Sequence, residues 1–299
     1  MLKTDRYSLV RFSLLVLLAL SFCGCSSTGF GLFIANSVAG LAEFNVVKSV
    51  NYGPLEAHEL DIYIPNAYSA VSNQKLPVVI FFYGGCWGAC STYTKDKYAF
   101  VAEVLTTNNY IAVIADYRLY PDVLFPDIIA DASLVVEWVK ENIEEYGGDG
   151  DSLFLMGHSA GAHLAAMLTT DERHLESATH DSIKGFVGMA GPYDFLPFDE
   201  HYQRILFGPP ENYPDSQPVN FVDGSEPPML LLYGDRDRVV KSRNIENMFT
   251  RANEAGIDVT RHLYTGINHS GLVAALSRVL RNKKPVARDV VDFLDKNST

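Results

Sequence analysis

The sequence predicts an α/β protein in which a mostly parallel sheet is covered by helices on both faces. From Leu76 onward, short apolar runs alternate with stretches whose apolar residues recur at helical spacing. The runs are unbroken, as at 78–82, which is typical of strands buried on both faces. At 151–169 one such run turns directly into an alanine- and leucine-rich helical pattern. The 299 residues, 47% of them apolar, are enough for one sizeable core.

The expected strands and helices follow one another in a regular order. Alternating apolar and polar residues over 60–65 predict a first strand, antiparallel and at the edge of the sheet. Further strands are expected at 78–82, 111–115, 153–156, 185–189, 229–233 and 259–264. Helical spacing predicts helices at 97–107, 128–143 and 242–255, directly after Gly161, and at the C-terminus. In such a sheet we expect the active site at the carboxyl ends of the strands.

We expect a single α/β domain over 51–299, preceded by an N-terminal tether or helix over 25–50. The apolar and small residues of 30–50 favour an amphipathic helix that packs on the body, or one that lies against a membrane. Residues 191–228 are rich in proline, aromatic and acidic residues and have little periodicity. We interpret them as a short cap or pocket-lining insertion; the alternative is an ordinary long surface loop.

The first 24 residues are expected to be a removed signal segment. Three basic residues precede an apolar run at 12–22, which has the length of a signal-peptide core. With glycine just before Cys25, the segment resembles a bacterial lipoprotein signal, and Cys25 would carry the lipid. Ser26 resembles the pattern sent to an outer membrane, facing the periplasm. Phe22 is less usual at its position, so an ordinary secretory cleavage site or a retained anchor is the alternative.

Charge and cysteine content narrow the possible partners. The net charge of −12 and the lack of a basic cluster argue against nucleic acid. Cys23 would leave with the signal, so that Cys86 and Cys90 remain as possible partners in a small disulfide loop. Two free thiols are the alternative. The further ligands that zinc would need are missing, and we expect no metal.

The sequence Gly157-His158-Ser159-Ala160-Gly161 joins a predicted buried strand to a predicted helix. Gly-x-Ser-x-Gly in this context forms a sharp turn that exposes the serine hydroxyl at the end of the sheet. The helix N-terminus beneath it favours the negative charge that develops in acyl transfer. The expected nucleophile is therefore Ser159. The alternative, a glycine-rich loop with an incidental serine, is disfavoured by the flanking strand and helix.

A serine nucleophile needs a base, and an acid must orient that base; the chain order here is serine, acid, histidine. Two aspartates, Asp235 and Asp237, follow strand 229–233. We expect Asp237 to be the acid and Asp235 to belong to a surface charge cluster. His269, in the loop after strand 259–264, is the expected base. Three other histidines are interpreted as packed, solvated or hydrogen-bonding residues: His262, His158 and His163.

The oxyanion is expected to be held by main-chain N–H groups from two places. One is Ala160, directly after the nucleophile. The other is the loop 84–87, where glycines after strand 78–82 let the backbone approach the substrate oxygen. The alternative for these glycines is a plain turn. A disulfide from Cys86 would stiffen the loop and help to preorganise it.

Over roughly 50–295 the chain resembles the hormone-sensitive-lipase-like and feruloyl-esterase-like carboxylesterases, which have the α/β-hydrolase fold. The matching motifs are 84–87, Asp116–Leu119 with Pro121, Phe125-Pro126, Asp131, Trp138, 157–161, Gly191–Asp194 and the Asp237 and His269 loops. The resemblance implies oxyanion donors at Gly85, Cys86 and Ala160. Tyr83 stands where the family usually has histidine, and we expect this to affect substrate preference and rate more than reaction type.

Three charged residues beside the predicted site, Asp116, Arg118 and Asp131, could be taken for part of it. We interpret them as a structural ion-pair network beneath the active edge.

These observations predict a serine carboxylesterase that hydrolyses small or aryl carboxylic esters through an acyl-enzyme, without a cofactor. An amidase, such as an arylformamidase, or a peptidase on the same scaffold is the alternative, because the triad does not distinguish amide from ester. A non-catalytic binding lipoprotein is the remote alternative, and loss of a triad residue would be its signature.

Overall fold

The computed structural model describes residues 36, 44–66, 68 and 75–298. The expected signal segment 1–24 and the expected lipidation site Cys25 lie outside the described residues. Within those residues, no helix has the length and apolar character that a membrane span requires.

In the described part of the chain, eight strands form one sheet in the order β1-β2-β4-β3-β5-β6-β7-β8. From β4 to β8 the neighbouring strands are parallel, whereas β2 pairs antiparallel with both β1 and β4. The strands are β1 (Phe44–Asn51), β2 (Glu59–Pro65), β3 (Leu76–Phe82), β4 (Ile111–Ala115), β5 (Gly148–His158), β6 (Ile183–Met189), β7 (Met229–Gly234) and β8 (Val259–Tyr264). The predicted mostly parallel sheet is confirmed.

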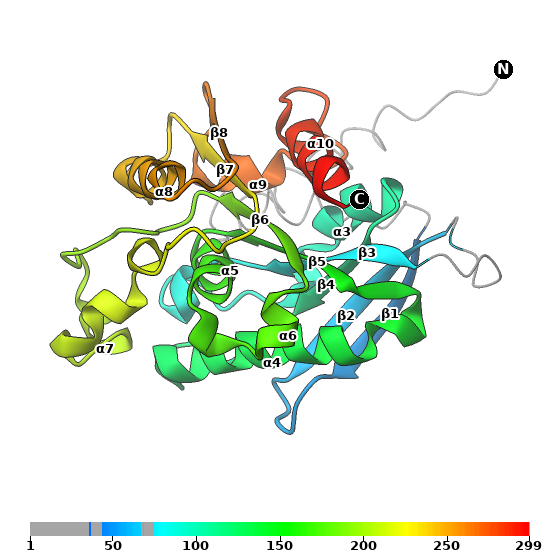
Figure 1. Cartoon of the computed structure of the whole chain (residues 1–299), viewed down its shortest axis with the longest axis horizontal. Coiled ribbons are helices and arrows are strands. Elements are labelled where there is room, and N and C mark those ends of the chain that lie inside the picture. The colour runs from blue at the N-terminus through cyan, green and yellow to red at the C-terminus, as the bar shows by residue number, and fades with distance from the viewer. Residues whose placement is uncertain (1–35, 37–43, 67, 69–74, 299) are drawn as a thin grey trace, which may run out of the picture.

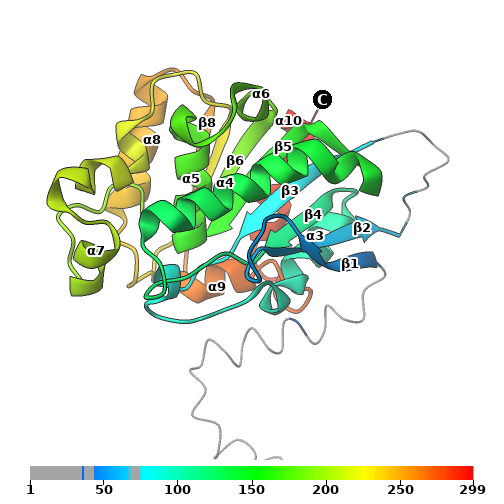
Figure 2. The same ribbon diagram turned by 90° about the horizontal axis from the view of Figure 1, so that it is seen from below.

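Helices cover both faces of this sheet. The α-helices are α3 (Ala99–Thr107), α4 (Phe125–Asn142), α5 (Ala160–Thr170), α6 (Ser177–His180), α7 (His201–Leu206), α8 (Arg243–Glu254), α9 (His269–Ala274) and α10 (Val286–Asn297). Figure 1 shows α4, α5 and α8 on one face of the sheet and α3 and α10 on the other. Figure 2 gives the first of these faces from below, with α4 and α5 running across the strands. This is the α/β-hydrolase architecture.

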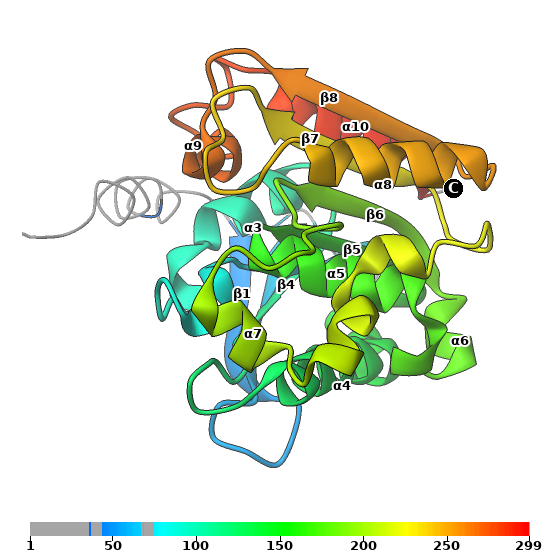
Figure 3. The same cartoon turned by 90° about the vertical axis from the view of Figure 1, so that its left-hand side faces the viewer.

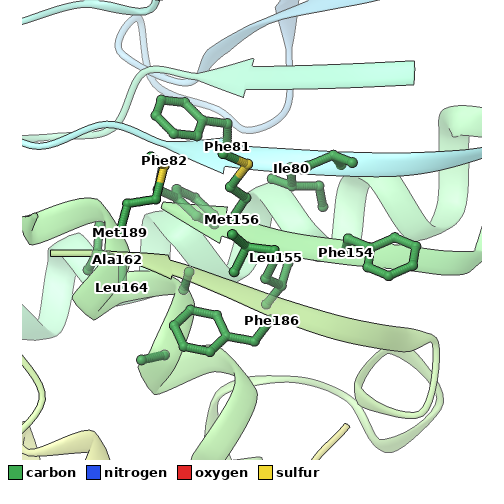
Figure 4. Close-up of a cluster of buried hydrophobic side chains, with 14 of the residues drawn as sticks. Ile80, Phe81, Phe82, Phe154, Leu155, Met156, Ala162, Leu164, Phe186 and Met189 are labelled. Atoms are coloured by element: carbon green, nitrogen blue, oxygen red, sulfur yellow. The ribbon is translucent and has the colours of Figure 1, made fainter. Parts of the chain in front are cut away.

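The core is built where β3, β5 and β6 run side by side. Apolar side chains from these strands and from α5 meet between the sheet and the helix (Figure 4). The parallel pairing of β3 with β5 sets Phe81 beside Met156. Because both faces of these strands are covered, their sequences are continuous apolar runs. The central strands are therefore held rigidly, and their carboxyl ends form a fixed base for the loops that follow.

The prediction of an N-terminal tether or helix up to residue 50 is wrong for its described end, because Phe44–Asn51 form β1. The prediction that 60–65 lies at the sheet edge is also wrong, since β1 pairs outside β2. A register shift between Val47 and Val50 interrupts the alternation in β1, and Ser49 there has φ 53°. Because β1 is also largely exposed, its apolar residues carry no strand-like pattern.

The segments expected to carry the site gather at the end of the sheet toward which the parallel strands point. Figure 3 shows α9 and α7 at this end. The connection 191–228 between β6 and β7 contains α7 and two short 3₁₀ helices, η6 (Pro210–Ser216) and η7 (Pro218–Asn220). Two further 3₁₀ turns follow β3, η2 (Cys86–Gly88) and η3 (Lys95–Lys97).

Candidate active site

Ser159 occupies the turn between β5 and α5. Its backbone has φ 57° and ψ −125°, a conformation that is uncommon for a residue with a side chain. The turn closes because its flanking residues are glycines. A Cβ on Gly157 would lie 2.3 Å from the Gly161 carbonyl oxygen, and one on Gly161 would lie 2.0 Å from the oxygen of Phe82. Only glycine fits at these two positions, and the tight turn presents the serine above the helix N-terminus.

Of the predicted triad, the side chains of Asp237 and His269 are hydrogen-bonded to each other; in the described part of the chain no other pair of triad side chains is. His269 Nδ1 lies 2.7 Å from Asp237 Oδ2. The other carboxylate oxygen, Oδ1, accepts the main-chain N–H groups of Val239 at 2.8 Å and Val240 at 3.0 Å. The Asp237 side chain is 0% exposed and the His269 side chain 15%. The carboxylate is therefore fixed, and it holds the imidazole by Nδ1 so that Nε2 remains free for another partner.

Asp235 has a different place. Its side chain is exposed, and its Oδ1 accepts the main-chain N–H of Gly266 at 2.7 Å. Asp235 thus joins the loop after β7 to the loop after β8, and among the described residues it makes no hydrogen bond to the His269 ring.

Ser159 and His269 line the same pocket. No hydrogen bond joins their side chains in the described residues, and in free hydrolases this bond often tightens only when substrate binds. His158 helps to position His269, because its Nε2 donates to the His269 carbonyl oxygen at 3.0 Å. Burial, and after it the nearby His269, lowers the pKa of His158 to about 3, so the His158 ring is neutral at physiological pH.

Three main-chain N–H groups face no acceptor at this site. Within the described residues, the N–H groups of Gly85, Cys86 and Ala160 make no hydrogen bond. Gly84 brings the loop into contact with Ser159: a Cβ on Gly84 would lie 2.8 Å from Ser159 Cβ. The loop after β3 and the start of α5 thus supply free donors next to one serine, which is the arrangement that an oxyanion hole requires.

The loop after β3 is held from several sides. Cys86 and Cys90 form the disulfide that their spacing made possible. Tyr83 stacks between Tyr98 and Tyr117, and its hydroxyl donates to Asp116 Oδ1 at 2.9 Å. Tyr83 therefore supports the loop from below and does not reach into the site.

The charged residues beside the site form two separate networks. Arg118 donates to Asp131 with Nη2–Oδ1 at 2.7 Å, and buried His58 contacts the same carboxylate at 3.1 Å. Asp116 does not join this network; it accepts from Lys95, whose Nζ lies 3.2 Å from Oδ2. Both networks tie loops to the sheet and leave the Ser159 pocket to other residues.

The remaining histidines considered from sequence lie elsewhere. His262 is part of β8. His163 is fully buried in α5, where its Nε2 donates to the Ser216 carbonyl oxygen at 2.8 Å. No cluster of side chains that could hold a metal ion is present among the described residues.

Two pockets meet at Ser159. The larger, of 310 Å³, has His269, Tyr93, Tyr98 and Val273 in its wall. The smaller, of 80 Å³, is lined by residues of the loop after β3, of 191–228 and of the start of α8: Cys86, Trp87, Ser159, Ala160, Pro192, Phe195, Asp199, Tyr202, Gln203, Val239, Val240, Lys241, Arg243 and Asn244. The connection 191–228 therefore lines the site. A cavity of 890 Å³ beside α4 shares no lining residue with either pocket.

The fold and the serine turn define a member of the α/β-hydrolase class. The BD-FAE family matches residues 60–252, and the chain belongs to this family. This confirms the resemblance to feruloyl-esterase-like carboxylesterases that the motifs indicated.

Individual curated relatives share about a quarter to a third of their aligned residues with this chain. The chain is 28% identical to a probable isoprenylcysteine alpha-carbonyl methylesterase, ICMEL1, of Arabidopsis thaliana over 251 residues, covering 76% of this chain and 51% of that protein. It is 26% identical to esterase LipC of Mycobacterium tuberculosis, covering 82% and 68%. Kynurenine formamidase of Danio rerio is 35% identical over 161 residues, covering 52% and 49%. The chain thus spans about half the length of several curated relatives that it matches.

Solved structures show the same fold. A truncated carbohydrate esterase from gut microbiota superposes with a TM-score of 0.71 at 22% identity, covering 85% of this chain and 96% of that one. Propionate-bound esterase 2 of Thermogutta terrifontis superposes with a TM-score of 0.67 at 21% identity, covering 86% and 95%.

Proposed function

We propose that this protein is a serine carboxylesterase. The observation that carries the proposal is the convergence at one point of a strained serine turn, a buried Asp237–His269 pair and main-chain N–H groups without acceptors. Acyl transfer needs a nucleophile, a base with its orienting acid, and donors for a developing oxyanion. The site offers each of these from rigid elements.

In the proposed mechanism Ser159 Oγ attacks the ester carbonyl carbon while His269 Nε2 takes its proton. Asp237 keeps the proton on Nδ1 and stabilises the imidazolium that forms. Gly85, Cys86 and Ala160 donate their N–H groups to the oxyanion. As the intermediate collapses, the bond to the leaving oxygen breaks and His269 returns the proton to that oxygen. Water, deprotonated by His269, then attacks the acyl-enzyme and releases the acid and Ser159.

The two pockets suggest where the two parts of an ester substrate bind. Because His269 protonates the leaving alcohol, that alcohol must lie on the His269 side, in the larger pocket. Its wall contains Tyr93, Tyr98 and Val273, which suit an apolar or aryl alcohol. The acyl group extends to the other side of Ser159, into the smaller pocket. The proposed substrates are accordingly esters with a short acyl chain and a larger alcohol.

The relatives favour the same activity, since those named above include a methylesterase and an esterase. Turnover of p-nitrophenyl esters from acetate to decanoate, with wild type and Ser159→Ala, tests the proposal. We expect hydrolysis of the short esters, a fall in kcat/KM as the chain lengthens, and loss of activity in Ser159→Ala. A folded wild type that hydrolyses none of these esters would contradict it.

A second candidate is an amidase that acts on aryl formamides. The relative named kynurenine formamidase favours it, with 35% identity over 161 residues. Phenyl formate and formanilide, compared at equal concentration, separate the two activities. We expect the ester to be the better substrate by kcat/KM; a preference for formanilide would assign the amidase.

We further propose that residues 1–24 direct export and that Cys25 is lipidated, so that the enzyme is anchored to the bacterial cell envelope, at the outer membrane facing the periplasm. The basic and apolar pattern of 1–24 supports this, and a disulfide between Cys86 and Cys90 is compatible with an oxidising compartment. Metabolic labelling with an alkyne fatty acid should mark the wild type and leave Cys25→Ser unmarked. Equal labelling of both would contradict the proposal.

A further inference from the structure

The smaller pocket beside Ser159 carries a net positive charge, although the chain as a whole carries −12. Its charged lining residues are Asp199, Lys241 and Arg243. Lys241 Nζ and Asp199 Oδ2 are 2.6 Å apart and neutralise each other. Arg243 makes no salt bridge with any described carboxylate, so its charge remains uncompensated at the pocket wall.

Two buried N–H groups of the same pocket have no acceptor. In the described part of the chain, neither Arg243 Nε nor Trp87 Nε1 makes a hydrogen bond. The Trp87 side chain is buried, with only 3% of its residue surface exposed. Buried donors are normally paired, because an unpaired one loses its bond to water without replacement. These two donors are therefore available to a ligand that supplies an acceptor.

A single hydrogen bond fixes the Arg243 side chain and leaves other N–H groups of its guanidinium without a partner in the described residues. Its Nη2 donates to the Leu196 carbonyl oxygen at 2.8 Å, which holds the guanidinium against the 191–228 connection. The neighbouring amide of Asn244 is already used, since its Nδ2 donates to the Lys241 carbonyl oxygen at 3.1 Å and its Oδ1 accepts the N–H groups of Tyr193 and Asp194. Among the buried side-chain N–H groups of the described pocket wall, those of Arg243 Nε and Trp87 Nε1 are thus left for a bound group.

We propose that this pocket binds a carboxylate carried by the acyl part of the substrate, so that the enzyme prefers half-esters of short dicarboxylic acids. This rests on the proposed esterase function, which places the acyl group in the smaller pocket. A guanidinium forms two parallel hydrogen bonds to a carboxylate, and burial strengthens them. A carboxylate fills a donor-lined, positively charged pocket of 80 Å³ better than an alkyl end does.

The test compares benzyl hydrogen succinate with benzyl 4-methylpentanoate. Both have the same leaving group, and their acyl ends have the same shape, but an isopropyl group replaces the carboxylate. Wild type should show a higher kcat/KM for the succinate. Arg243→Met should lower the ratio of the two values by roughly 10- to 150-fold, the usual range for a charged hydrogen bond. Trp87→Phe, which removes the ring N–H together with part of the indole ring, should also lower the ratio severalfold.

Arg251→Met is the matched control. Arg251 lies on the same helix, and its Nη2 also donates to a main-chain oxygen, that of Val222 at 2.6 Å, but it does not line the pocket. This variant removes the same charge and should keep the wild-type ratio. A fall as large as that of Arg243→Met would show a general charge effect and overturn the proposal.

Other outcomes are equally decisive. If wild type hydrolyses the 4-methylpentanoate as well as the succinate, or if the preference survives in Arg243→Met, the carboxylate pocket is wrong while the esterase stands. If Arg243→Met does not fold, Arg243→Gln takes its place, and a wild-type preference for the succinate that survives in this variant overturns the proposal. If folded wild type hydrolyses neither these esters nor p-nitrophenyl esters, the esterase function itself fails.

Discussion

Asp237 Oδ2 lies 2.7 Å from His269 Nδ1, and this carboxylate has no exposed surface. Its second oxygen is held by two main-chain N–H groups. In Asp237→Asn the amide oxygen would keep those two bonds, so its NH₂ group would face His269. The ring would then carry its proton on Nε2 and could not accept one from Ser159. We expect kcat to fall on the order of 10⁴-fold with little change in stability.

Asp235→Asn is the control for that experiment. Its Oδ1 accepts the main-chain N–H of Gly266, and among the described residues it makes no hydrogen bond to His269. A loss of kcat below about tenfold is expected in the same p-nitrophenyl acetate assay. Equal losses in the two variants would mean that Asp237 is not the orienting acid.

Gly84→Ala should impair catalysis through a steric effect. The added Cβ would lie 2.8 Å from Ser159 Cβ and 2.9 Å from the His158 carbonyl oxygen, so the glycine loop or the serine turn must move. A displacement of about 1 Å at a reacting group costs roughly 10²-fold in rate. We expect kcat to fall by about that factor for p-nitrophenyl acetate.

Gly256→Ala separates backbone strain from this steric effect. Gly256 has φ +86°, and a Cβ there would meet nothing within 4 Å. The variant should lose about 1 kcal/mol of unfolding free energy, measured in urea, and keep its kcat. If Gly84→Ala lowers stability but leaves kcat intact, the contact with Ser159 does not constrain catalysis.

The disulfide between Cys86 and Cys90 should matter for rate because Cys86 offers a proposed oxyanion donor. Cys90 is exposed and accessible to a reductant. Reduction releases a loop whose closure contributes about 2 kcal/mol in the chain-entropy description. We expect dithiothreitol to lower kcat severalfold and to lower the Tm. Cys90→Ser should resemble the reduced wild type and be insensitive to dithiothreitol; a reduced wild type with unaltered kcat would contradict this role.

Much of the fold and site could be predicted because local signals and topology agree. Continuous apolar runs mark strands covered on both faces, and Ser159, Asp237 and His269 follow in chain order the ends of β5, β7 and β8. The choice between Asp235 and Asp237 was harder, since both follow the same strand. Only tertiary contacts show that one carboxylate faces the base and the other bonds a neighbouring loop.

Other features depend on contacts that no local pattern records. The first strand was missed because an exposed edge strand with a register shift has no regular alternation. Arg243 was missed for a related reason. In sequence it is one of several basic residues near the start of a helix, and only the fold shows that Lys241 is neutralised by Asp199 while Arg243 is not.

His163 should make the unfolding free energy of the protein fall at acid pH. It is fully buried among the rings of Trp87, Phe125, Phe195 and Phe207. Burial lowers its pKa to about 4, against the hydrogen bond to Ser216, which raises it. Since the folded pKa lies below the ordinary value of about 6.5, this contribution to stability is complete above pH 6.5. It is lost as the pH falls from 6.5 towards 4, where the unfolded chain binds a proton that the native ring refuses.

As the pH falls from 6.5 towards 4, each buried histidine with a lowered pKa reduces the unfolding free energy by about 1.4 kcal/mol per pH unit. His158, with its pKa lowered to about 3, adds a second such contribution. His163→Gln can still donate to Ser216 but does not titrate. Urea unfolding at pH 7.5, 6.0, 5.5 and 5.0 should show a slope in the variant that is smaller by about 1.4 kcal/mol per unit below pH 6.5. Parallel curves for the two proteins would mean that His163 already exchanges its proton with solvent in the native state, and that the aromatic shell around it opens.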